Sequence, residues 1–124
     1  MQECYKYTIK AIPPSNNKYI GRNMRWEYQE VKKQWAKIIY FVCRDKPPKP
    51  LKKAVVKITY YFKDNIRRDC DNYSGKMILD GLVNAGIIED DSFKHIELVL
   101  KAFFKCEEAK TEITIKPVED IEGT

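Results

Sequence analysis

The sequence lacks several features that would place it in well-known classes of protein. No apolar run approaches the roughly 20 residues of a membrane-spanning helix, so we expect no membrane partner. Its four cysteines, Cys4, Cys43, Cys70 and Cys106, form no Cys-x-x-Cys pair. This spacing argues against a zinc finger or a disulfide scaffold and favours free thiols. The N-terminal segment also has no apolar signal region, and we therefore predict a cytoplasmic protein.

Common catalytic motifs are missing as well. The single histidine, His95, has no cysteine or serine partner in a recognisable motif, and there is no Gly-rich phosphate loop or Gly-x-Ser-x-Gly sequence. The length of 124 residues is that of one domain, and 44% apolar with 33% charged residues is an ordinary globular composition. The missing motifs therefore leave no competing class of enzyme.

The charge is distributed unevenly along the chain. Residues 1–68 carry 17 Lys and Arg against 5 acidic residues, a net charge of +12, whereas residues 69–124 carry 6 against 13, a net charge of −7. A basic surface beside an acidic cluster suits an enzyme that binds a polyanion and holds a metal ion on carboxylates. The alternative is that these charges serve solubility alone.

Hydrophobic periodicity predicts a β-α-β-α-β-β order of elements. The strands are expected over residues 4–12, 54–63, 95–104 and 111–116, the last two as an antiparallel hairpin. The first helix should begin at an Asn23 cap, and the second should be capped by Asp71-Asn72 and end at Gly86. We predict an α+β fold: a single domain over residues 1–117, with a mixed four-stranded sheet and two helices on one face, followed by a polar tail at 118–124.

Carboxylates cluster at the predicted ends of elements. They are Asp69, Asp71, Glu89, Asp90 and Asp91. Asp69 and Asp71 are two residues apart, so in an extended chain their side chains project from the same edge, about 7 Å from each other. The second helix could bring the acidic turn formed by Glu89, Asp90 and Asp91 back beside them. The result would be a site with only oxygen ligands, which selects Mg²⁺ or Mn²⁺ rather than zinc. The alternative is that Asp71 is only a helix cap and Asp90-Asp91 only a solvated turn.

Basic residues adjoin this acidic cluster. Arg67 and Arg68 precede Asp69 directly and could hold phosphate oxygens next to a metal ion, or could form exposed ion pairs of little energetic value. Lys76 lies four residues before Asp80. It could therefore clamp a phosphate at the metal site, or simply form an intrahelical salt bridge.

Several of these residues fall in motifs that resemble a known family. They are similar to motifs of the RusA family of Holliday-junction resolvases. The similar segments are PPSNNKY at 13–19, RRDCDN at 67–72, then Lys76, Asp80 and GLVNAGIIEDD at 81–91. The resemblance runs from the first strand to the acidic turn and fits the terminal strands. One departure is that three residues, Tyr73-Ser74-Gly75, separate the D-x-D-N motif from the lysine, where the family pattern has two.

The resemblance implies a small, dimeric, Mg²⁺-dependent endonuclease that nicks four-way DNA junctions symmetrically. It implies metal binding by Asp69, Asp71 and Asp91, with Mn²⁺ able to substitute, and an essential role for Lys76. We assign DNA contacts to residues of the two motifs and to Lys76. They are Arg67, Arg68, Asn72, Lys76, Asn16, Asn17 and Lys18.

Two functions thus remain in view. The first is a homodimeric structure-specific endodeoxyribonuclease acting on branched DNA. The second is a non-catalytic DNA-binding protein of recombination or prophage origin, with the same basic surface and no chemistry. The sequence alone does not separate them.

Overall fold

The computed structural model describes residues 4–19 and 24–119. The main elements follow the predicted order: β1 (Tyr5–Ile9), α1 (Arg25–Val42), β2 (Ala54–Tyr61), α2 (Lys76–Asn84), β3 (Ile96–Phe103) and β4 (Lys110–Pro117). Two short 3₁₀ helices are added, η1 (Asn16–Tyr19) and η2 (Cys70–Tyr73). The predicted Asn23 cap lies outside the described residues, as does most of the predicted tail.

The strands form one mixed sheet in the order β1-β4-β2-β3. β2 and β3 are parallel, and β4 is antiparallel to both of its neighbours. The predicted β3–β4 hairpin is therefore wrong, because β2 lies between these two strands. The reason is burial: Thr111, Ile113 and Ile115 of β4 are fully buried, and a strand with such an inner face is best placed at the centre of the sheet.

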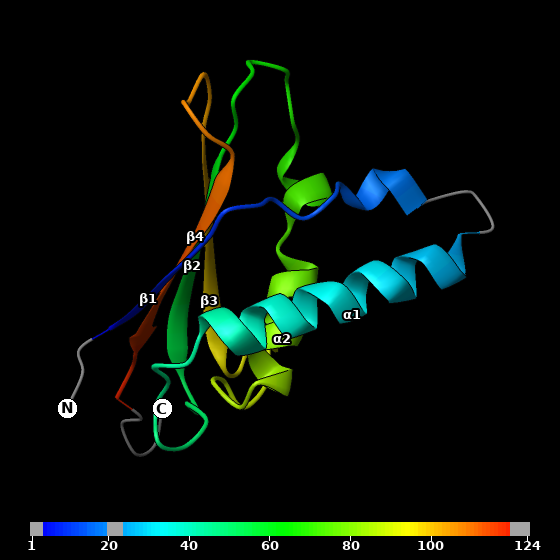
Figure 1. Cartoon of the computed structure of the whole chain (residues 1–124). Coiled ribbons are helices and arrows are strands. Elements are labelled where there is room, and N and C mark those ends of the chain that lie inside the picture. The colour runs from blue at the N-terminus through cyan, green and yellow to red at the C-terminus, as the bar shows by residue number, and fades with distance from the viewer. Residues whose placement is uncertain (1–3, 20–23, 120–124) are drawn as a thin grey trace.

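Both helices cover the same face of the sheet, as predicted (Figure 1). The core between the layers includes Trp35 and Ile39 of α1, Ile78 and Leu82 of α2, and the inward side chains of the strands. The helices approach each other closely at Gly81, where an added Cβ would lie 2.5 Å from the Ile39 side chain. No helix in the described ranges is long and apolar enough to span a membrane.

The helix layer leaves part of β3 uncovered. Ile96, Leu98, Leu100 and Ala102 share the helix-facing side with β2, as their register with Ala54, Val56, Ile58 and Tyr60 shows. Of these four side chains in β3, only Ile96 is buried. All four side chains therefore point toward the helix layer, but only Ile96 is covered by it. The exposed strip at the sheet edge borders the candidate site.

The second helix starts later than predicted. Asp71 lies in η2, and α2 begins only at Lys76, after Gly75 in the left-handed region at φ 80°. The predicted Asp71-Asn72 cap of this helix is thus wrong, which leaves the Asp71 carboxylate without a capping role. Gly86 does adopt the predicted positive φ after the helix. An added Cβ at Gly75 would also lie 2.5 Å from Ile58 Cδ1, so this link requires glycine.

Candidate active site

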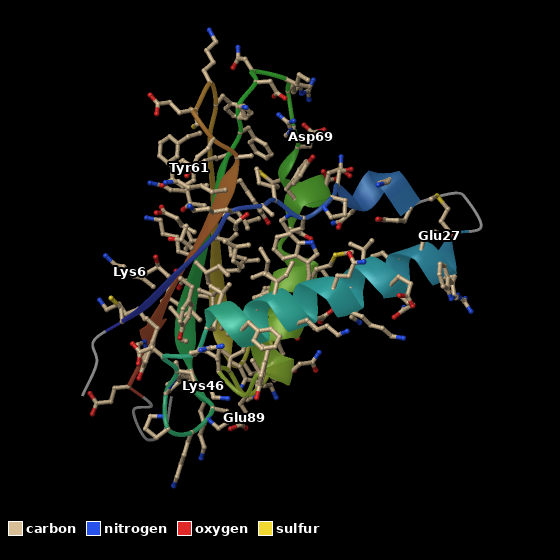
Figure 2. All side chains as sticks on the ribbon, viewed as in Figure 1. Lys6, Glu27, Lys46, Tyr61, Asp69 and Glu89 are labelled. Carbon is tan, nitrogen blue, oxygen red and sulfur yellow. The ribbon has the colours of Figure 1, made fainter. Side chains whose placement is uncertain are left out.

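The candidate site lies where the chain returns from the end of β2 to the helix side of the sheet. Asp69 has extended backbone and directly precedes η2, which contains Asp71. Both side chains are exposed. Figure 2 shows Asp69 on the helix side, away from Tyr61 and Lys6, which project from the opposite face of the sheet. The two aspartates of the D-x-D motif are therefore presented to solvent on a short, tightly connected segment.

Arg68 fixes the chain immediately before Asp69. Its guanidinium donates hydrogen bonds to both carboxylate oxygens of Asp64, at 2.5 and 3.2 Å, and one to the carbonyl oxygen of Ile66. The same group lies 4.0 Å from the Phe62 ring centroid and 6.0 Å from that of Tyr73, which belongs to η2. Arg68 thus links the loop after β2 to η2, and its side chain is only 20% exposed. Arg68 therefore acts as a brace within the protein.

Titration of Asp64 reflects this brace. The hydrogen bond from Arg68 lowers the pKa of the Asp64 carboxyl below its usual value. A depressed folded-state pKa means that the pairing favours folding above the ordinary aspartate pKa and is lost as pH falls through the lowered value. Near neutral pH, the brace is accordingly intact.

A second tether comes from the PPSNN motif. The side-chain amide of Asn16 donates hydrogen bonds to the Asp71 carbonyl oxygen at 2.8 Å and to Ser74 Oγ at 3.0 Å. Asn16 therefore holds η1 against η2, although it was predicted as a DNA contact. Lys18 is exposed, and Asn72 is half-buried with its backbone N–H bonded to the Asp69 carbonyl oxygen. The Asn17 side chain lies outside the described residues.

Arg67 and Lys76 differ from Arg68 in being exposed. Arg67 Nε lies 3.3 Å from Asp69 Oδ1 in a pair open to solvent, the weak arrangement considered from the sequence. Lys76 Nζ lies 3.8 Å from Asp80 Oδ2 and is 58% exposed, so the intrahelical pair is also present. Asp80 has a closer partner in Lys32 of α1, at 3.3 Å. Because Lys32 still balances the Asp80 charge, Lys76 can swing away at small cost.

The acidic turn stands at the other end of the uncovered strip of β3. Asp91 lines a hollow with Leu79, Ile96 and Leu98. Asp69 lines a separate, smaller hollow of about 70 Å³ with Tyr73 and Leu100. Leu98 and Leu100 are successive residues on one side of β3, so the two hollows are neighbours along the strand. Glu89 lies far from Asp69, near the end of α2 (Figure 2).

The three predicted metal ligands are not gathered into a cluster. Within residues 4–19 and 24–119, no group of three or more His, Cys, Asp or Glu side chains lies close enough to hold a metal ion. The donor chemistry nevertheless fits a hard cation, because Asp69, Asp71 and Asp91 offer only carboxylate oxygens. The structure therefore provides two presented carboxylates, and a third along the same strip.

Sequence reasoning missed two residues that shape this site. Asp64 was not singled out, although a carboxylate four residues before an arginine is a local pairing signal. Lys32 was not singled out either, because its contact with Asp80 depends on how the two helices pack. Neither partner belongs to the motifs that drew attention to the site.

Comparison with known proteins identifies the class of protein to which the chain belongs. The family model described as endodeoxyribonuclease RusA matches residues 9–116. No curated protein matches the sequence. The fold, the D-x-D segment and this match together define a nuclease that cuts within DNA. The chain belongs to the RusA endodeoxyribonuclease family.

Proposed function

We propose that the protein is a Mg²⁺-dependent, structure-specific endodeoxyribonuclease that resolves four-way DNA junctions by paired symmetric nicks. The observation that carries the proposal is the D-x-D segment, in a chain that matches the nuclease family over residues 9–116. Arg68 and Asn16 hold the backbone around Asp69 and Asp71, while both carboxylates face solvent. A segment whose backbone is fixed and whose carboxylates are open to solvent suits ligands that must meet an incoming phosphodiester.

Asp69, Asp71 and Asp91 would hold the metal ion, with Mn²⁺ able to replace Mg²⁺. A bound ion of this kind polarises the scissile phosphate and lowers the pKa of a bound water. Asp69 and Asp91 border neighbouring hollows on the same strip of β3, so movement of the acidic turn toward Asp69 would bring the carboxylates together. Such gathering is favoured by the ion, since three close carboxylates repel one another without it.

The cations beside the carboxylates take different roles. Arg67 is exposed and paired only weakly, so it can exchange Asp69 for a phosphate oxygen. Lys76 can leave Asp80 to Lys32 and place its ammonium group near the scissile phosphate, where negative charge develops. Arg68 acts as a positioning residue, because its donors already bind Asp64 and Ile66.

The substrate requires two such sites. A four-way junction has approximate two-fold symmetry, and its resolution needs nicks in two opposed strands. We therefore propose a two-fold homodimer with an isologous interface, which presents the same site twice. Large exposed side chains of α1, such as Trp26, Tyr40 and Phe41, offer apolar surface for contact between subunits. Light scattering at micromolar concentration tests this assembly.

A cleavage assay separates the proposal from its alternative. The protein is incubated with a labelled four-way junction, a flap and a linear duplex, each with and without Mg²⁺. Paired nicks in the junction that require the ion support the proposed activity. Binding of the junction without cleavage in Mg²⁺ or Mn²⁺ would instead identify a non-catalytic DNA-binding protein, and preference for the flap would revise the substrate.

A further inference from the structure

Among the described residues, no element covers the side of the sheet that faces away from the helices (Figure 1). We call this side the open face. Its strand residues are Lys6 and Thr8, then Val55, Lys57, Thr59 and Tyr61, then Glu97, Val99, Lys101 and Phe103, and finally Lys110, Glu112, Thr114 and Lys116. Figure 2 shows Lys6 and Tyr61 projecting from it, opposite to Asp69.

Positive charge dominates the open face. Its strands contribute five lysines and two glutamates. None of the five lysines forms an ion pair within the described part of the chain, in contrast to Lys32 and Lys76 on the helix side. One of the two glutamates, Glu112, is engaged as the acceptor of a hydrogen bond from the Tyr61 hydroxyl. The strands of the open face therefore carry five positive and two negative charges, a net charge of +3.

The strand register shows that this arrangement is not neutralised across the sheet. Lys57 lies opposite Thr114 and Val99, Lys101 opposite Thr59, and Lys116 opposite Val55. A water-exposed sheet usually gains stability by placing lysine opposite glutamate. Here no registered pair on the open face joins opposite charges, so a polyanion laid across these strands would meet unpaired ammonium groups.

An aromatic pair at the β3 edge of the open face indicates the kind of polyanion. Tyr61 and Phe103 stack with ring centroids 5.4 Å apart and an interplanar angle of 22°. Lys110 Nζ lies 4.7 Å from the Tyr61 centroid. Phe103 is 48% exposed and offers its ring to a partner. Lysines beside an exposed aromatic ring are the two elements of sheet surfaces that bind single-stranded nucleic acid, so this ring would suit an unstacked base where the arms of a junction meet.

The edge strand β3 connects the open face to the candidate active site. Leu100 and Ala102 line the hollow beside Asp69, while Lys101 and Phe103 lie on the open face of the same strand. We propose that the open face binds the sugar–phosphate backbone of a second DNA arm, with β3 separating it from the arm that is cut. This inference rests on the proposed function and adds a DNA-binding surface to it.

A second copy of this chain is the competing occupant, and charge argues against it. A two-fold contact between open faces would bring lysines against lysines with no carboxylate surplus to balance them. DNA supplies closely spaced negative charge and gains free energy by releasing counterions. The open face is thus better matched to DNA than to itself.

The experiment compares two triple variants with equal loss of charge. One is Lys6→Gln/Lys57→Gln/Lys116→Gln on the open face, and its matched control is Lys37→Gln/Lys49→Gln/Lys52→Gln, at exposed positions away from it. Lys101 is left unchanged because it also lines the hollow at Asp69. Binding of a fluorescent four-way junction is measured by anisotropy in EDTA over a range of salt concentrations, with circular dichroism to check folding.

The open-face triple should reduce the slope of log Kd against log salt by about 2 to 3, since each lost phosphate contact contributes about 0.9. The control should change the slope by less than about 0.5. Equal slopes for the two triples, with Mg²⁺-dependent cleavage intact, would overturn the inference alone. If the wild-type protein neither binds nor cleaves the junction, the proposed function is overturned as well.

Acetylation footprinting provides a measurement that needs no variant. In the wild-type protein, junction DNA should protect Lys6, Lys57 and Lys116 from an amine-reactive reagent while Lys37 and Lys49 react as before. Protection of the first three lysines without DNA, increasing with protein concentration, would show that a second copy covers the open face and would overturn the inference.

Discussion

The two acidic segments of the candidate site are held in place by different means. The D-x-D segment is fixed by side chains from elsewhere: Arg68 links it to Asp64, and Asn16 binds the Asp71 carbonyl oxygen. The acidic turn is held through its backbone, with the Glu89 N–H bonded to the Leu51 carbonyl oxygen. The side chains of residues 89–91 make no hydrogen bond or ion pair with the described part of the chain.

This difference implies that the two segments play different parts in binding the metal ion. A segment tied to its surroundings by directed hydrogen bonds sets the position of the first ligands. A segment whose carboxylates are untethered can adjust to the ion when the site fills. Preorganisation on one side limits the entropy lost on binding, while freedom on the other reduces the repulsion among carboxylates before the ion arrives.

The strongest test of this difference removes charge from each segment. Asp69→Asn, Asp71→Asn and Asp91→Asn should each abolish cleavage of a four-way junction and leave junction binding equal or tighter, because carboxylates without an ion repel phosphate. Cleavage in Mg²⁺ and binding in EDTA are measured in parallel. Asp90→Asn serves as the control and should retain most activity. Wild-type rates for Asp91→Asn would remove the acidic turn from the site.

The next largest effect is expected at the cation between the two segments. Lys76→Ala should lower the single-turnover cleavage rate by about 10²- to 10³-fold, since a single donor at developing charge is typically worth that much. Junction affinity should change far less. Lys32→Ala is an informative companion, because without Lys32 the Asp80 carboxylate would retain Lys76 more strongly. Equal losses in rate and affinity for Lys76→Ala would reduce it to a general phosphate contact.

Much of this fold could be predicted from periodicity, and the reasons for the failures are physical. Alternation identified all four strands, and the helical stripes identified α1 and α2, since each of these elements buries one side against a common core. Periodicity says nothing about which strands are neighbours, so the central place of β4 was missed. Likewise, Asp71-Asn72 has the composition of a cap, and the left-handed Gly75 that delays α2 is a local geometry.

The residues of the candidate site were predicted from the sequence, and the structure changed the roles expected of some of them. Asp69, Asp71 and Lys76 remain predictions, made from their spacing and from motifs that resemble the family. Their neighbours were harder to interpret, because Arg68 could face phosphate or protein equally well until the position of Asp64 was known. Asn16 is similar, since its partner lies 55 residues away in the sequence.

The adjacent arginines allow the brace to be tested within one dipeptide. Arg68→Ala should lower cleavage by about 10-fold, equivalent to about 1.4 kcal/mol, and raise the Mg²⁺ concentration needed for half-maximal rate. Arg68→Lys should not restore the wild-type Mg²⁺ dependence, because an ammonium group lacks the forked donors that bind Asp64. Arg67→Ala should instead weaken DNA binding at unchanged Mg²⁺ dependence. The assignment fails if the two alanine variants show the same Mg²⁺ titration.

The smallest expected effect concerns the tether from η1. Asn16→Ala removes hydrogen bonds to the Asp71 carbonyl oxygen and to Ser74 Oγ, at a cost of about 1 kcal/mol. Because these bonds fix backbone and touch no ligand, activity should fall by about five-fold, and lowered Mg²⁺ affinity should explain most of that loss. Asn65→Ala, in the exposed loop after β2, is the matched control and should behave as wild type. A Mg²⁺ titration of cleavage, together with junction affinity in EDTA, distinguishes the tether from a direct DNA contact: a contact would weaken binding in EDTA and leave the Mg²⁺ dependence unchanged.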